Sequence, residues 1–137
     1  MAEFSTAGLD DLMLSMREIA EIPADVQDEI LNAQADVIVE AQKSRGRTYG
    51  VERTGMTLDS IKKGRPKLKN GSRVVYVTPT GTNKDGNRNA EVAFVNNYGK
   101  RTQRARPFIT EANETSAEQT TTAGAAVYDE WLKTKGL

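Results

Sequence analysis

The sequence predicts an α+β fold, in which a small antiparallel sheet of three to four strands is packed by N-terminal helices and a long C-terminal helix. Three observations predict it. Apolar residues recur at helical spacing through residues 9–43, an Asn-Gly pair separates two strand-forming segments, and helical spacing returns after Pro107. The chain of 137 residues has the size of one domain, so residues 1–137 are predicted to fold as a single unit.

The N-terminal third predicts two helices. Residues 4–8 form either a short edge strand or a lead-in, and apolar residues then follow helical spacing through residues 9–20. Pro23 suits the start of a second helix. Over residues 24–43 the apolar positions recur at steps of three and four, with acids on the remaining surface: Val26, Ile30, Ala33, Val37 and Ala41.

The middle of the chain predicts a loop, a short helix and a hairpin. Residues 44–53 contain two glycines and are predicted to form a basic loop, and residues 54–61 to form one or two helical turns with Leu58 and Ile61 inside. Residues 65–69 and 72–78 then predict paired strands. The intervening Asn70-Gly71 favours a turn in which both residues have positive φ.

The last third predicts a loop, a strand and a helix. The polar residues 79–89 predict a flexible loop, and residues 90–98 a third strand with Val92 and Phe94 on one face. Pro107 suits the first turn of the final helix. Its predicted inner face is narrow and mostly small, which suits close approach to another helix or subunit and is equally typical of a marginal helix that orders only in an assembly: Ala112, Ser116, Gln119, Ala123, Val127 and Trp131.

The composition leaves little room for catalysis. The chain has no cysteine and no histidine, which excludes disulfides, thiol nucleophiles, zinc sites and Ser-His-Asp machinery. No apolar run approaches the roughly 18 residues of a membrane span, and no secretory signal is visible. We therefore expect no enzymatic activity, no cofactor, no metal and no membrane contact.

Two glycine-rich and acidic patterns fail as binding motifs. Gly81 and Gly86 have the spacing of a phosphate loop, but Asn87-Arg88 stands where such a loop needs Lys-Ser or Lys-Thr. Asn83, Asp85 and Asn87 alternate like the start of a calcium loop. The glycine and the final glutamate of that loop are missing.

The zero net charge conceals a strong segregation along the chain. Residues 1–42 carry a net charge of −9, residues 43–106 carry +12, and residues 107–137 carry −3. Such asymmetry suggests electrostatic complementarity within one fold, between copies, or with a charged partner, whereas solvated helix faces beside basic strands are the plain alternative. The segment 43–106 also interleaves tyrosines with its bases, which suits contact with nucleic-acid phosphates.

Short motifs occur in an order that resembles a known family. They are Gly8-Leu9-x-x-Leu12, the acidic helix 24–43, Thr54-Gly55-(x)4-Ser60-Ile61, the hairpin, Phe94-Val95-Asn96-Asn97-Tyr98-Gly99 and Arg106-Pro107-Phe108-Ile109. This order resembles the tail-completion and neck proteins of tailed bacteriophages, the family named for the gene-ten product of phage Hong Kong 97. The chain departs from the family pattern at Asn97 and Lys100, where an acid and a threonine are usual, at Glu52-Arg53, where a proline is usual, and in the extended 79–89 loop.

The resemblance implies a structural virion protein at the head–tail junction, assembled in the host cytoplasm. It implies a homo-oligomeric ring, commonly sixfold, whose partners are other neck, connector and tail-tube proteins, with weak contact to DNA in the channel. The positions that match the family motifs are Thr54, Gly55, Ser60, Ile61, Tyr98, Gly99, Pro107 and Phe108.

In a ring, the acidic and basic segments are predicted to meet across subunits, because each copy then offers an acidic face to the basic face of its neighbour. The residues predicted at this interface are Arg45, Arg47, Arg53, Lys100, Arg101, Arg104, Arg106, Asp25, Asp28, Glu29, Asp36 and Glu40. The alternative function is a nucleic-acid-binding module that uses residues 43–106.

Overall fold

The computed structural model describes residues 2–5, 22–51 and 56–136, with the backbone alone for residues 2–5 and 56. The helix predicted over residues 9–20 lies outside the described residues, as do Arg53, Thr54 and Gly55. In chain order the elements are β1 (Ala2–Ser5), α2 (Ala24–Tyr49), α3 (Met56–Asp59), β2 (Ile61–Lys63), β3 (Lys67–Lys69), β4 (Ser72–Pro79), α4 (Asn89–Tyr98), α5 (Phe108–Thr115) and α6 (Ala117–Thr134).

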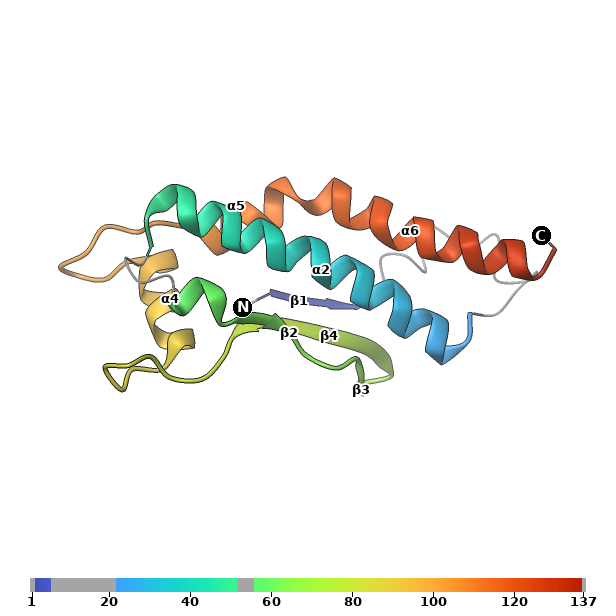
Figure 1. Cartoon of the computed structure of the whole chain (residues 1–137), viewed down its shortest axis with the longest axis horizontal. Coiled ribbons are helices and arrows are strands. Elements are labelled where there is room, and N and C mark those ends of the chain that lie inside the picture. Colours follow the sequence, from blue (N-terminus) through green and yellow to red (C-terminus); the bar gives the residue numbers. More distant parts are fainter. Residues whose placement is uncertain (1, 6–21, 52–55, 137) are drawn as a thin grey trace.

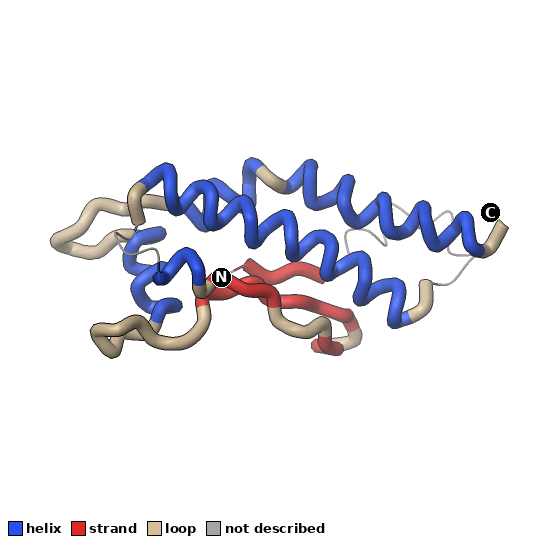
Figure 2. Tube along the Cα trace, in the orientation of Figure 1, coloured by secondary structure: helices blue, strands red, loops and turns tan. Residues whose placement is uncertain are grey.

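The molecule is built around the long helix α2. One side of α2 packs on the sheet and another side packs on α5 and α6, so that the helix lies between the two layers (Figure 1). Figure 2 shows the strands gathered below the helices, with α4 and two loops at one end of the molecule. This arrangement confirms the predicted α+β class, with a small antiparallel sheet and a long C-terminal helix.

The sheet is organised by β4. Strand β1 pairs with residues 74–77 of β4, while β2 and β3 pair with residues 77–79 and 72–74, all antiparallel. Because Val77 pairs with both β1 and β2, and Val74 with both β1 and β3, the strands β2 and β3 lie along one edge of β4 and β1 lies along the other. The predicted hairpin is confirmed, because Asn70 and Gly71 between β3 and β4 both have positive φ, 51° and 82°. The strand β2 was not predicted.

The core lies between the sheet and α2. Val75 and Val77 of β4 are buried against α2 residues that include Leu31 and Ile38, and Phe108 of α5 is fully buried in the same cluster. A second cluster joins α2 to the C-terminal half of α6 through Val26, Ile30, Tyr128 and Leu132. Leu58 and Ile61 are buried, as predicted.

The predicted loop at residues 44–53 is wrong for its first half, because α2 continues to Tyr49. Gly46 is a buried helical residue, and a Cβ there would lie 2.2 Å from Leu58 Cδ2. The glycine therefore permits close packing of Leu58 and does not break the helix. Gly50 ends it with φ 62°, and Val51 donates its N–H to Gly46 O at 3.0 Å, which is a left-handed helix cap.

The predicted third strand at residues 90–98 is wrong, because this segment forms helix α4. Its buried side chains are Asn89, Ala93, Asn96 and Asn97, which fall on one helical face. The asparagines are hydrogen-bonded, so this inner face is polar and invisible to a hydrophobic pattern. The apolar alternation that predicted a strand instead leaves Phe94 61% exposed.

The predicted C-terminal helix is divided into α5 and α6 at Ser116. The buried face runs through Ala112, Ser116, Thr120, Gly124, Tyr128 and Leu132, whereas the predicted Gln119 is exposed and Ala123, Val127 and Trp131 are partly buried. Gly124 sets this register, because it lies against Gln34 of α2 and a Cβ there would come within 2.8 Å of Gln34 Nε2. Small residues thus bring α6 close to α2.

Candidate functional site

Five of the predicted interface residues on α2 lie toward its two ends, whereas Asp36 and Glu40 lie between them. Arg45 and Arg47 lie in its last turns, whereas Asp25, Asp28 and Glu29 lie in its first turns. At a rise of about 1.5 Å per residue, the helix from Asp25 to Arg47 is about 33 Å long. One chain therefore has a basic end and an acidic end that cannot reach each other.

A second segment rich in bases, the 99–107 loop, lies at the same end as the last turn of α2. Arg106 Nη1 donates to Gly50 O at 3.0 Å and thereby ties the loop to the cap of α2. Tyr49 donates to Glu111 Oε1 at 2.6 Å, which ties α2 to α5, and this hydrogen bond raises the pKa of Tyr49 above its ordinary value. The structure thus brings together the predicted bases Arg45, Arg47, Lys100, Arg101, Arg104 and Arg106 at one end.

Hydrogen bonds hold the 99–107 loop on α4. The Arg106 N–H donates to Asn96 O at 2.6 Å, and Gln103 Nε2 donates to Asn96 Oδ1 at 3.2 Å. Gly99 makes the turn possible, because its φ is 77° and a Cβ there would lie 2.7 Å from Ala105 N. This accounts for the glycine of the aromatic-glycine motif.

The motif residues before α5 serve the helix start. Asn97 Oδ1 accepts the backbone N–H groups of Ile109 and Thr110 at 2.9 and 3.1 Å, satisfying donors in the first turn of α5. Pro107 precedes that helix, and Phe108 is fully buried. These positions shape the fold that carries the basic end.

The remaining described motif positions join α3 to the sheet. Ser60 Oγ donates to Thr57 O at 2.6 Å, and Ser60 O accepts the N–H and the hydroxyl of Thr80 at 3.0 and 2.9 Å. Ile61 is fully buried. Both positions therefore have structural roles.

Two of the five predicted acidic interface residues pair within the chain. Asp28 accepts two hydrogen bonds from Arg73 of β4, at 2.5 and 2.9 Å, which raise the pKa of Arg73. Asp36 lies 2.8 Å from Lys63 Nζ of β2. These two acids pin α2 to the sheet. Within the described residues no ion pair reaches the three others, Asp25, Glu29 and Glu40.

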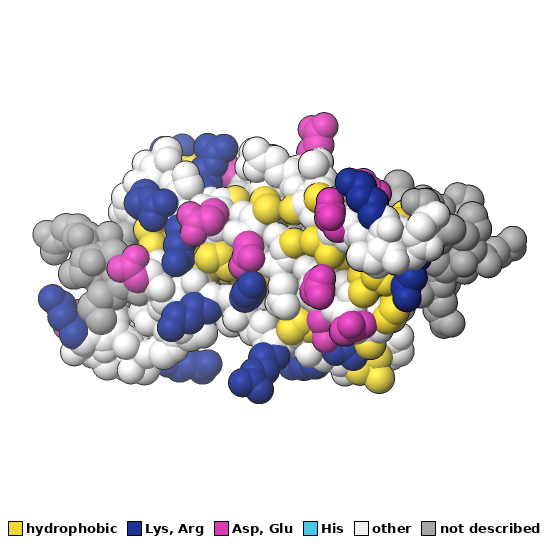
Figure 3. Space-filling view, turned by 45° about the vertical axis from the view of Figure 1, so that its right-hand side comes forward, with side chains coloured by type: hydrophobic (Ala, Val, Ile, Leu, Met, Phe, Trp, Pro, Cys, Tyr) yellow, Lys and Arg dark blue, Asp and Glu magenta, His cyan; other side chains and the backbone are white. Residues whose placement is uncertain are grey.

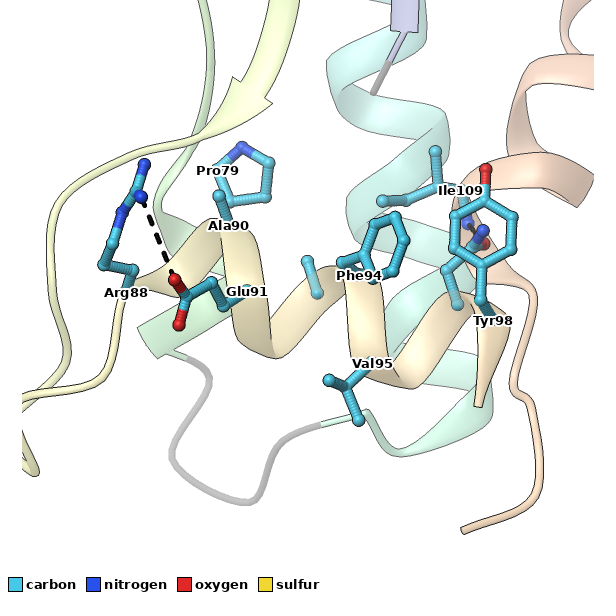
Figure 4. Close-up of a pocket in the computed structure, with 10 residues that line it drawn as sticks. Pro79, Arg88, Ala90, Glu91, Phe94, Val95, Tyr98 and Ile109 are labelled. Carbon is cyan, nitrogen blue, oxygen red and sulfur yellow. Dashed lines mark hydrogen bonds and ion pairs between the residues drawn. The ribbon is translucent and has the colours of Figure 1, made fainter. Parts of the chain in front are cut away.

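Sequence reasoning missed an exposed aromatic patch on α4. Phe94 and Tyr98 are 61% and 59% exposed, and their ring centroids lie 4.7 Å apart. They line a hollow of about 430 Å³ together with Pro79, Ala90 and Ile109 (Figure 4). The four-residue step from Phe94 to Tyr98 places both rings on one face in a strand as well as in a helix, but only a helix brings the two rings into contact.

A second hollow, of about 670 Å³, lies at the acidic end between the start of α2 and the end of α6. Its apolar lining includes Val26, Val127 and Trp131, and its carboxylates are Asp25, Glu29 and Glu130, with Lys135 also present. It was missed because the notable residues of α6, Val127 and Trp131, were predicted to face inward. They are only partly buried.

The loop after β4 is a turn built on Asn83. Its side-chain Oδ1 accepts the N–H groups of Asp85 and Asn87, both at 3.0 Å. Among the described residues, no cluster of three acids suits a metal ion, and no helix has both the length and the apolar character needed to cross a bilayer.

Comparison of the chain with protein-family models, curated proteins and solved structures gave no match.

Proposed function

We propose that this protein is a structural component of a ring at the head–tail junction of a tailed bacteriophage, acting in tail completion, as a tail terminator or in the neck. The observation that carries the proposal is the placement of Asp25 and Glu29 in the first turns of α2 and of Arg45 and Arg47 in its last turns. A subunit with unlike ends suits heterologous contacts, which generate a ring when the rotation between neighbours closes.

The phage assignment is supported by the order of the short motifs. The described motif residues occupy defined places in the fold, such as the turn at Gly99 and the helix start at Pro107-Phe108. In this role the loops at residues 79–89 and 100–106 contact neighbouring connector or tail-tube rings or line the channel. Contact with DNA there is weak, because tight binding would impede its passage. The proposed role is not enzymatic.

Electron microscopy of the purified protein tests this proposal. At low salt and high protein concentration we expect closed rings with a central opening, and we expect them to dissociate as salt screens the contacts between charged ends. Particles that remain monomeric under all these conditions, including in the presence of purified tail tubes, would contradict the proposal.

A nucleic-acid-binding module is a second candidate, favoured by the sheet face that points away from α2. There Lys67 Nζ and Lys69 Nζ lie 4.7 and 5.2 Å from the ring centroid of Tyr76. The register places Lys62 on the same face. If this candidate is correct, DNA retention falls steeply with salt, and Lys62→Gln with Lys67→Gln weakens it. Retention unaffected by these substitutions would exclude it.

A further inference from the structure

The two ends of the molecule are complementary in both charge and apolar character. One end carries the Phe94–Tyr98 patch, lined by Arg88 and Glu91 and followed in the chain by the exposed bases Lys100, Arg101 and Arg104. The other carries the Val127–Trp131 hollow, lined by three carboxylates and Lys135. We propose that the Phe94–Tyr98 patch of one copy packs into the Val127–Trp131 hollow of the next copy, head to tail. This inference rests on the proposed function, because it names the contact that builds the ring.

The basic end has the composition of an interface centre with a polar rim. Two aromatic rings are more than half exposed at its centre, where water contact is unfavourable. Exposed bases flank them on both sides in the sequence, with Arg88 before α4 and Lys100, Arg101 and Arg104 after it. Arg88 Nη1 lies 3.8 Å from Glu91 Oε1. Within the described chain no ion pair involves Lys100, Arg101 or Arg104.

The acidic end has the matching composition. Val127 and Trp131 are partly buried beside the second apolar cluster, and the Trp131 ring lies 5.9 Å from that of Tyr128. Asp25, Glu29 and Glu130 are exposed around the hollow. Figure 3 shows bases most densely at the left and along the lower edge, with others at the right, and acidic side chains across the whole face beside apolar surface in the middle and right.

A second copy in head-to-tail orientation satisfies both ends at once. Two basic ends, or two acidic ends, would place like charges opposite each other, which disfavours a symmetric pair. A single chain cannot join its own ends across the length of α2. The unlike ends therefore favour a head-to-tail contact that is the same between each copy and the next.

Two variants that each disable one end test the proposal. Phe94→Gln with Tyr98→Gln removes the aromatic centre without adding charge, and Glu29→Lys with Glu130→Lys reverses the acidic rim. Because the substituted side chains are exposed, both variants are expected to fold, which thermal unfolding verifies. The matched controls are Leu68→Gln, another exposed apolar residue, and Glu114→Lys with Glu118→Lys, which carry the same charge change elsewhere.

Sedimentation velocity measures assembly of each protein alone and of an equimolar mixture. We expect each variant alone to associate at least tenfold more weakly than the natural chain, and both controls to associate normally. The mixture should form a one-to-one dimer that grows no further, because each pair has one intact basic end and one intact acidic end.

The outcomes separate the inference from the proposed function. If the natural chain forms rings but either variant alone also does so, or if the mixture gives no dimer, the head-to-tail contact is wrong and the ring proposal stands. If the natural chain forms no assembly at any concentration or salt, the ring proposal fails, and the inference fails with it.

Discussion

Glycines at three positions determine how closely segments of this chain approach one another. The Leu58 side chain lies against Gly46, the backbone of residues 103–105 lies against Gly99, and the Gln34 side chain lies against Gly124. Gly99 also has positive φ, whereas Gly46 and Gly124 are helical residues whose missing side chain is what matters. Each of these glycines is therefore a packing residue.

Gly46→Ala gives the sharpest test at this scale. In an exposed helix the change stabilises by about 1 kcal/mol, but here the new Cβ would overlap the buried Leu58 side chain. We expect the overlap to dominate and the free energy of unfolding to fall by about 1–2 kcal/mol in chemical denaturation.

A double-mutant cycle with Leu58→Ala shows whether that contact is the cause. In the Leu58→Ala background, Gly46→Ala should be neutral or stabilising by up to about 1 kcal/mol. An equal loss of stability in both backgrounds would show that the strain lies elsewhere.

At the scale of elements, α2 is held to its two neighbouring layers by different chemistry. Toward the sheet it uses an apolar core and the ion pairs of Asp28 and Asp36. Toward α6 it presents the apolar Val26 and Ile30 near its start and the polar Gln34 further along. In this second part Gln34 Oε1, Ser116 Oγ and Thr120 Oγ1 are buried with no hydrogen-bond partner among the described residues. Unpartnered polar atoms therefore weaken the α2–α6 contact around Gln34.

Thr120→Val tests this weakness. Removing a buried hydroxyl without a partner should leave the free energy of unfolding unchanged or raise it by up to about 1 kcal/mol. Thr121→Val is the matched control, because that hydroxyl is exposed and donates to Ala117 O. A loss of 1 kcal/mol or more for Thr120→Val, beyond that of the control, would show that its hydroxyl makes a stabilising bond.

Asp28→Asn tests the ion pair between α2 and the sheet. The Asp28 and Arg73 side chains are 31% and 24% exposed, and their two-pronged geometry is favourable. We expect a loss of about 1 kcal/mol in unfolding free energy and no effect on assembly. Asp25→Asn should do the reverse, weakening assembly while leaving stability within about 0.5 kcal/mol. Equal effects of the two substitutions would contradict this division of the acids.

At the scale of the whole molecule, much of the fold could be predicted from the sequence. The helix from residue 24, the Asn70-Gly71 hairpin and the C-terminal helical segment follow from local spacing and turn chemistry. The α4 helix could not be predicted because its buried face is made largely of asparagines, while its aromatic residues face outward. The register of α6 depends on the fit of Gly124 against Gln34, which no periodicity contains.

The charged segments of the candidate site could be located from the sequence, but the positions of their side chains in the fold could not. The sequence placed bases and acids in separate segments, and in the structure Arg45 and Arg47 lie toward one end of α2 while Asp25 and Glu29 lie toward the other. Which acids are used inside the chain depends on contacts with β2 and β4, formed only by the fold. The aromatic patch was hidden by the prediction of a strand over residues 90–98.

If unlike ends join identical subunits into a closed ring, the mass of the intact assembly will reveal it. Native mass spectrometry should find one discrete multiple of the 15.0 kDa chain, about 90 kDa if the symmetry is sixfold. A population of 15.0 kDa monomers alone, or an open ladder of every multiple, would contradict the claim.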